Sequence, residues 1–315
     1  MARAPRPARG RPLVTGLLCA ALLGSAGGCS DPVERPAAQP APTPQSASPS
    51  TPDASPTPTE EEPVTPPPLS PQQQAEADRR LIAATWDNDV RRARQLIARG
   101  ADVNAQDETQ QSAYLVTTSE GYLRLLELTL RNGADVDAKD SFNGTGLIRA
   151  ADRGHWDVAG RLIVAGVEID HVNNLGWTAL HEAIILGDGS ERYVDTVRVL
   201  VAAGADVELR SERDGIAPLD HASSRGYDAI SGLLVRAIEA DADPGPGRVA
   251  AGDDLLAAAT TGDADAAVLA LREGARLETR DDEGRTPLEL ASAGAHLDVV
   301  RLLGALGAEP APADR

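Results

Sequence analysis

From residue 77 onward, apolar residues recur at spacings of three and four, which is typical of helices with one buried side. In the segment 194–201 the apolar positions are Val194, Val197, Leu200 and Val201. A shorter apolar segment precedes it at 182–186, and the two segments are followed by Gly187 and Gly204. The pattern predicts helices that come in pairs, with a glycine after each helix.

The glycines that follow the second helix of each pair are periodic. The tetrapeptide Gly-Ala-Asp-Val occurs three times, and alignment on its glycine gives six positions: Gly100, Gly133, Gly166, Gly204, Gly274 and Gly307. The first two spacings are 33 residues, and the interval from 204 to 274 has room for one further unit. A fixed period of this length is typical of stacked repeats. The sequence therefore predicts seven units, whose glycines end a helix in the left-handed conformation.

A second recurring segment marks the start of each helix pair. It reads GWTALHEA at 176–183, GIAPLDHA at 215–222 and GRTPLELA at 284–291. In the last copy Thr286 can cap the helix, Pro287 suits its first position, and Glu289 completes a capping box. These segments, followed by Gly-Ala-Asp some twenty residues later, resemble the ankyrin repeat. The resemblance implies an all-α solenoid of antiparallel helix pairs with hairpin-like finger loops.

The first and sixth units lack this starting segment, and both resemble the opening cap of an ankyrin array. Between the fifth and sixth units, Pro-Gly-Pro-Gly at 244–247 breaks any helix. We therefore expect about five repeats at 77–240, an irregular joint at 241–252 and two repeats at 253–312. Because two repeats are too few for a core of their own, we expect the last two repeats to dock together against the fifth repeat.

The N-terminus has the features of an export signal. Residues 1–28 combine four arginines, an apolar run at 13–23 and small residues before Cys29. This ending resembles a bacterial lipobox, although Ala26 stands where leucine is usual. The resemblance implies that Cys29 carries a lipid and holds the exported protein at the cell membrane. Ordinary cleavage, which would leave a free Cys29 in a secreted or periplasmic protein, is the alternative.

A proline-rich stretch separates this signal from the repeats. Residues 31–70 hold 13 of the 23 prolines, together with many serines, threonines and alanines. Such a composition cannot bury a core and favours extended chain. We expect residues 29–76 to form a disordered tether behind the lipid-attachment site.

The charge of the chain limits its partners. The formal net charge is −18, and removal of the four signal arginines makes the mature chain more negative still. Such a surface repels nucleic acid and anionic headgroups. We expect no nucleic-acid partner, and we expect a protein partner with a basic surface patch.

The sequence offers no constellation for catalysis or cofactor binding. The ankyrin resemblance implies structural roles for the five histidines, and no pair of them has zinc-ligand spacing. No phosphate-binding loop and no calcium-binding loop is present. We expect no enzyme activity, cofactor, metal or small-molecule substrate.

Partner-binding candidates come from the finger loops and from one insertion. Trp177, Ile216 and Arg285 occupy the same variable finger position in three repeats, and tryptophan is common in binding hot spots. Packing of the Trp177 ring on the neighbouring finger is the alternative. The insertion at 187–195 offers Tyr193 as an anchor, or is a tolerated surface loop.

These features favour a non-catalytic protein-binding module or scaffold. An immunity-like or chaperone-like factor that binds one exported enzyme is the second hypothesis. It would use the same kind of binding surface.

Overall fold

The regular elements of the described residues are α-helices, apart from one isolated bridge between Lys139 and Thr145. The computed structural model describes residues 69–243 and 248–310, which lie in the compact unit Thr65–Arg315. Its helices are α1 (Pro71–Trp86), α2 (Val90–Ile97), α3 (Ala113–Glu120), α4 (Leu123–Arg131), α5 (Gly146–Asp152), α6 (Trp156–Val164), α7 (Ala179–Ile185), α8 (Glu191–Ala202), α9 (Pro218–Ser224), α10 (Asp228–Ala242), α11 (Arg248–Thr261), α12 (Ala264–Arg272), α13 (Pro287–Ala293) and α14 (Leu297–Ala305). The expected all-helical fold with seven helix pairs is confirmed for this part of the chain.

Local sequence signals set the ends of these helices. The six periodic glycines have φ between 80° and 98°, a left-handed conformation that only glycine adopts without strain. At the start of α13, the Thr286 side chain accepts a hydrogen bond from the Glu289 N–H, and Glu289 bonds back to the Thr286 N–H. Pro287 fills the first helical position. The capping box and the glycine stop that the sequence predicts are both formed.

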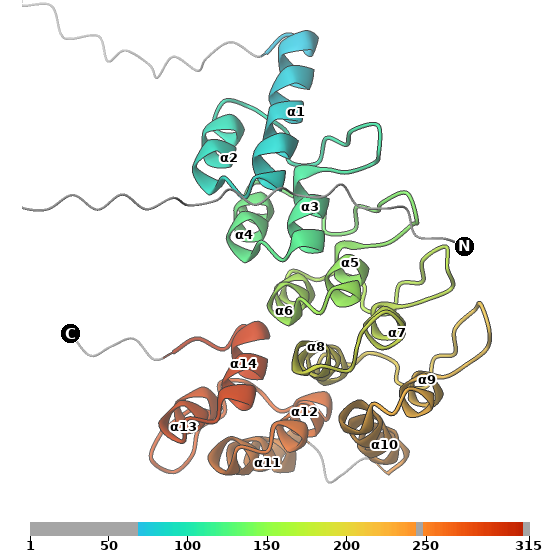
Figure 1. The fold of residues 1–315 in the computed structure, drawn as a ribbon. Coiled ribbons are helices and arrows are strands. Elements are labelled where there is room, and N and C mark those ends of the chain that lie inside the picture. The colour runs from blue at the N-terminus through green and yellow to red at the C-terminus, as the bar shows by residue number, and fades with distance from the viewer. Residues whose placement is uncertain (1–68, 244–247, 311–315) are drawn as a thin grey trace, which may run out of the picture. The chain divides into compact units, whose positions relative to one another are not determined.

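The first five pairs stack in two layers (Figure 1). The first helix of each pair, here called the inner helix, packs on the next inner helix in the order α1, α3, α5, α7, α9. The second, or outer, helices α2, α4, α6, α8 and α10 follow the same order. A small apolar cluster joins the first two pairs, and a larger one runs from the second pair to the last. Burial between neighbouring repeats therefore holds the array together, as in other solenoids.

The last two pairs do not continue this stack. Among the described residues, α11 packs mainly on α12 and α13, whereas α12 contacts α8 and α10, and α14 contacts α6 and α8. Figure 1 shows α12 and α14 beside these outer helices. The last two repeats were expected to dock against the fifth repeat. This expectation is wrong, because their main contacts are those of α12 and α14 with the outer helices of the third and fourth repeats, α6 and α8.

The surface of α11 gives a physical reason for this break. Four polar residues of α11 are exposed: Asp253, Asp254, Thr260 and Thr261. The matching positions of α1, at the start of the array, are also polar or exposed, as Arg79 and Arg80 show. When the exposed side of a first helix is polar, that helix closes a repeat array, because it cannot stack on the inner helix of a preceding repeat.

Two expected boundaries move. Helix α1 begins at Pro71 and not at residue 77, because Ser70 and Gln73 form a capping box before it. The joint between the fifth and sixth pairs is shorter than 241–252, because α10 runs to Ala242 and α11 starts at Arg248. The signal peptide, Cys29 and the tether up to residue 68 lie outside the described residues. Within residues 69–243 and 248–310, no helix has the length and apolar character needed to cross a bilayer.

Candidate functional site

The finger loops have closely related hairpin tips. In three of them the N–H of the first tip residue donates to the carbonyl four residues later, from Asp107, Asp140 and Asn173, at 2.9–3.0 Å. Asp281 closes its loop in the same way at 3.1 Å, whereas the Ser211 N–H donates to the carbonyl of Ile216, five residues later, at 3.1 Å. The finger that contains Ser211 is therefore one residue longer at its tip than the other four.

Each finger tip contains one residue in the left-handed conformation. These residues are Gln110 (φ 58°), Asn143 (57°), Gly176 (78°), Gly215 (70°) and Gly284 (79°). The residue that follows it is Gln111, Gly144, Trp177, Ile216 or Arg285, so the side chain at this position varies from repeat to repeat. Trp177, Ile216 and Arg285 thus have the equivalent positions that the sequence predicts.

Hydrogen bonds tie neighbouring fingers to one another. The Asn174 N–H donates to the Phe142 carbonyl at 2.9 Å, and the Glu212 N–H donates to the Gly176 carbonyl at 3.0 Å. The Gln106 side chain reaches the next finger at the Lys139 carbonyl, 2.9 Å away. Figure 1 shows these loops projecting on one side of the inner helices. We call the loops 98–112, 132–145, 165–178 and 203–217, together with α3, α5, α7 and α9, the finger face.

Apolar side chains on the finger face lie in an acidic surface. Phe142 is 57% exposed and Ile216 is 37% exposed. Trp177 lies in the finger between them and is half-buried, with the Arg213 guanidinium 5.7 Å from its ring centre. Each of the four loops carries two more acidic than basic residues. Aromatic and aliphatic anchors within a charged rim are typical of protein-binding surfaces.

A buried polar layer supports the fingers from below. The Asp140 carboxylate accepts a 2.7 Å bond from Arg149 of α5, and the Asn173 amide donates to Glu182 of α7 at 2.7 Å. Burial raises the pKa of Glu182 to about 7, an effect that the bond from Asn173 partly offsets. These side chains fix the finger bases on the inner helices.

The histidine of the fourth repeat has the bracing role that the ankyrin resemblance implies. His181 forms a capping box with Thr178 at the start of α7 and packs edge-on against His221 of α9, with ring centres 6.2 Å apart. Burial, together with the neighbouring His221, lowers the pKa of His181 to about 4. A neutral ring with this role is structural. Among residues 69–243 and 248–310, no three His, Cys, Asp or Glu side chains are grouped to hold a metal ion.

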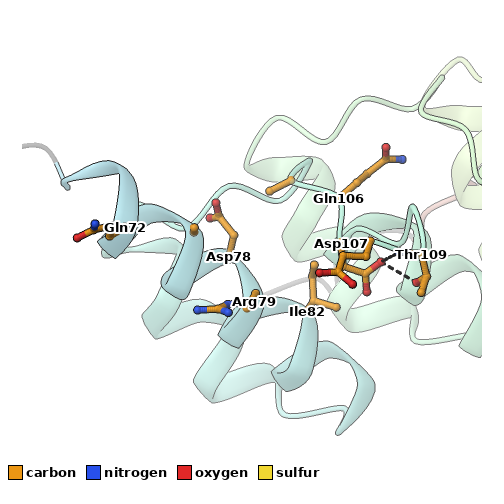
Figure 2. Close-up of a pocket in the computed structure, with 10 residues that line it drawn as sticks. Gln72, Asp78, Arg79, Ile82, Gln106, Asp107 and Thr109 are labelled. Atoms are coloured by element: carbon orange, nitrogen blue, oxygen red, sulfur yellow. Dashed lines mark hydrogen bonds between the residues drawn. The ribbon is translucent and has the colours of Figure 1, made fainter.

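An open cavity of about 670 Å³ lies beside the first finger (Figure 2). Helix α1 contributes Asp78, Arg79 and Ile82 to its wall, and the finger contributes residues 105–109. Figure 2 shows Asp107 bonded to Thr109, which fixes the finger wall of the cavity. The cavity gives the start of the array a hollow surface next to the finger face.

The structure separates the predicted site residues. Trp177 and Ile216 lie in adjacent fingers of one surface, whereas Arg285 lies in the finger of the last pair, where it is ion-paired with Asp281 at 2.7 Å. The prediction that Tyr193 is an exposed anchor is wrong. Tyr193 is only 5% exposed, and its hydroxyl donates to the Asp152 carbonyl at 3.1 Å. It packs between the third and fourth repeats and cannot serve as an exposed anchor.

One residue of the finger face was missed by sequence reasoning. Phe142 is the only phenylalanine of the chain and stands in a finger tip between Asp140 and Asn143, where a buried role is not expected. A large apolar residue in a loop of turn-forming residues was the available signal.

Family comparison agrees with this geometry. A model for ankyrin repeats in three copies matches residues 113–211 and 147–245, and a single ankyrin-repeat model matches residues 283–315. The chain belongs to the ankyrin-repeat family. These models leave out the helix pairs α1–α2 and α11–α12. These two pairs are the first and sixth units, which lack the starting segment.

Relatives of this ankyrin-repeat protein differ in size and context. The ankyrin repeat protein YahD of Escherichia coli (strain K12) is 34% identical over 143 residues, which is 45% of this chain and 71% of YahD. Protein phosphatase 1 regulatory subunit 27 of Mus musculus is 39% identical over 27% of this chain and 51% of its own length. A crystal structure of an ankyrin repeat domain from Acinetobacter baumannii AYE is 50% identical, with a TM-score of 0.48 over 50% of this chain and 80% of that one. Ankyrin repeats generally mediate protein–protein interaction, so the chain has the fold of a binding module.

Proposed function

We propose that the chain is a non-catalytic protein-binding module that grips another protein with its finger face. The observation that carries this proposal is the alignment of Phe142, Trp177 and Ile216 on adjacent fingers joined by main-chain hydrogen bonds. Because the loops are fixed to one another and to the inner helices, binding would cost little ordering of the surface. The acidic loops favour a partner with a basic patch, whose association slows as salt is raised.

The binding module is, in this proposal, exported and held on the outer side of the cytoplasmic membrane by a lipid on Cys29. Support comes from the residues before Cys29 and from the proline-rich composition of 31–70, which suits a tether. A soluble secreted or periplasmic protein is the alternative. An immunity-like or chaperone-like role toward one exported enzyme would use the same finger face.

The experiment that tests the proposal is chemical crosslinking in intact cells, followed by capture of the full-length protein. Variants Phe142→Ala and Trp177→Ala should each reduce the captured partner, whereas Val235→Ala should not. Val235 is a 40% exposed apolar residue of the outer helix α10, which is not part of the finger face, and is therefore a matched control. Equal capture by all three variants would reject the finger face. One stoichiometric enzyme partner would favour the immunity-like role over a scaffold with several partners.

A further inference from the structure

Positive charge gathers at one end of a chain that is acidic as a whole. The outer-helix segment of the first repeat, residues 89–100, has four arginines and one aspartate, which give it a formal charge of +3. The matching segment of the second repeat, 122–133, has two arginines and one glutamate, and that of the third, 155–166, has one arginine and one aspartate. The positive charge of the outer helices therefore falls with distance from α1, the helix at which the proline-rich segment joins the array.

The arginines of the first segment have no carboxylate partners of their own. Four exposed arginines lie on α2 or just after it: Arg91, Arg92, Arg94 and Arg99. Among residues 69–243 and 248–310, none of the four forms an ion pair, whereas Arg79 and Arg80 of α1 both pair with Glu76. Their charge is therefore available to an anion outside the chain.

Packing fixes the direction in which these arginines point. The apolar side of α2 carries Ala93, which is buried, and Leu96 and Ile97, which are partly buried in the cluster that α2 shares with α1 and α4. The arginines lie on the opposite, exposed side. Arg124 of α4 is equivalent to Arg91, is also exposed, and extends the positive surface onto the next outer helix. We call the residues Arg91, Arg92, Arg94, Arg99 and Arg124 the arginine patch.

The arginine patch and the acidic finger loops lie on different sides of the array. Figure 1 shows α2 and α4 on the side of α1 and α3 that faces away from the finger loops. A helix with its side chains is about 10 Å across, whereas the Debye length at physiological ionic strength is about 8 Å. The acids closest in sequence, Asp87 and Asp89, leave an excess of positive charge at the patch. The net charge of the chain therefore does not decide what this surface attracts.

We propose that the arginine patch docks the first two repeats on a membrane surface rich in anionic phospholipid headgroups. Guanidinium groups bind phosphate oxygens through two parallel hydrogen bonds, and clustered basic residues accumulate at negatively charged bilayers. A membrane is favoured over other polyanions because the segment that follows Cys29 joins the array at α1, which packs directly on α2. In this respect the inference rests on the proposed membrane attachment.

Docking through α2 would complement the lipid on Cys29. A lipid chain and a basic surface on one molecule hold it to a bilayer more firmly than either does alone, because the second contact forms at high effective concentration. The finger loops, on the other side of the inner helices, then face away from the bilayer and toward a partner.

Co-sedimentation with lipid vesicles tests the docking in the absence of the lipid anchor. A chain of residues 30–315 keeps the whole compact unit Thr65–Arg315 and lacks both Cys29 and the signal arginines. It should bind vesicles rich in phosphatidylglycerol at about 0.1 M salt and leave them at about 1 M salt, where the Debye length falls to about 3 Å. It should not bind vesicles made of phosphatidylcholine alone.

A pair of matched variants locates the binding. The triple variant Arg91→Gln, Arg92→Gln, Arg94→Gln should lower partition onto the anionic vesicles about tenfold or more. The control Arg225→Gln, Arg276→Gln, Arg280→Gln also removes three exposed arginines and should bind as the unmodified chain does. Melting temperatures of both variants check that the fold is kept.

Three results would overturn the proposal. The first is no binding of the unmodified chain to anionic vesicles at about 0.1 M salt. The second is an equal loss of binding in both triple variants, which would assign the effect to net charge and not to α2. The third is tighter binding to a short DNA duplex than to vesicles at the same phosphate concentration, which would make the patch a nucleic-acid site. Because the tested chain lacks Cys29, these results are independent of whether the lipid anchor exists.

Discussion

Replacement of Glu182 by glutamine is expected to stabilise the protein at neutral pH. Glu182 is 4% exposed; its Oε1 accepts the bond from Asn173, and its Oε2 has no hydrogen-bond partner among the described residues. Burial raises its pKa from 4.5 to about 7. At about 1.4 kcal/mol per pKa unit, this difference amounts to about 3 kcal/mol lost when the folded protein must ionise the group. Glutamine has the same shape, can accept the same bond and carries no charge.

The sign of the pH dependence follows from the raised pKa. Between pH 4.5 and about 7 the folded chain holds a proton on Glu182 that the unfolded chain has released. Glu182 therefore leaves the free energy of unfolding undiminished below pH 4.5 and lowers it progressively as the pH rises to about 7. His181, whose pKa burial lowers to about 4, acts in the opposite direction between about pH 4 and 6.5. The pH dependence of wild-type stability would hide both effects, because they oppose each other. The contribution of His181 is the same in wild type and in Glu182→Gln, so it cancels in the difference between their free energies of unfolding.

Urea unfolding followed by far-ultraviolet circular dichroism measures this difference. We expect Glu182→Gln and wild type to be equally stable near pH 4, and the variant to gain up to about 3 kcal/mol near pH 8. The control Glu108→Gln, at an exposed finger position, should show no such trend. A difference that does not change with pH, or a variant less stable than wild type near pH 8, would show that Glu182 is not ionised at a cost.

Three further outcomes are expected. Trp177→Ala should weaken binding of the crosslinked partner about thirtyfold, or about 2 kcal/mol, with the melting temperature kept; a lower melting temperature with unchanged affinity would assign Trp177 to packing. Cys29→Ala should move the protein from the membrane pellet to the soluble exported fraction, and a wild-type protein that is already soluble would contradict the lipid anchor. A chain ending at Asp243 should unfold cooperatively, whereas a chain that begins at Arg248, the first residue of α11, should show no cooperative transition, because its two repeats lack the packing partners α6 and α8.

The sequence predicted the local parts of this fold well, because they depend on contacts a few residues apart. The glycine at 204 ends its helix in the left-handed conformation, and Thr286 with Glu289 caps α13, as expected. The equivalent finger positions of Trp177 and Ile216 followed from the same alignment. Repetition makes such predictions strong, since each unit is an independent copy of the same local solution.

Predictions that depended on contacts between distant segments were less accurate. Tyr193 belongs to an insertion that was read as a surface loop, but it lies in the first turn of α8, and its burial depends on the space that Gly154 and Gly187 leave beside it. The start of α1 was placed too late because proline at 71 was read as part of the tether and not as the first residue of a capped helix. In both cases a loop-like composition concealed a residue that its surroundings make structural.

The position of the last two pairs was also wrong, yet α8 carried a signal for it. An outer helix of a solenoid keeps a polar side toward water, as Arg124 and Arg131 do on α4. On α8 the run Val199, Leu200, Val201 and Ala202 leaves no polar side over its last turn, and all four residues are buried. A helix that is apolar on every side must be covered on every side. Stacking within the array covers only part of α8, so the sequence required a second element on its outer side, and α12 and α14 are the elements that supply it.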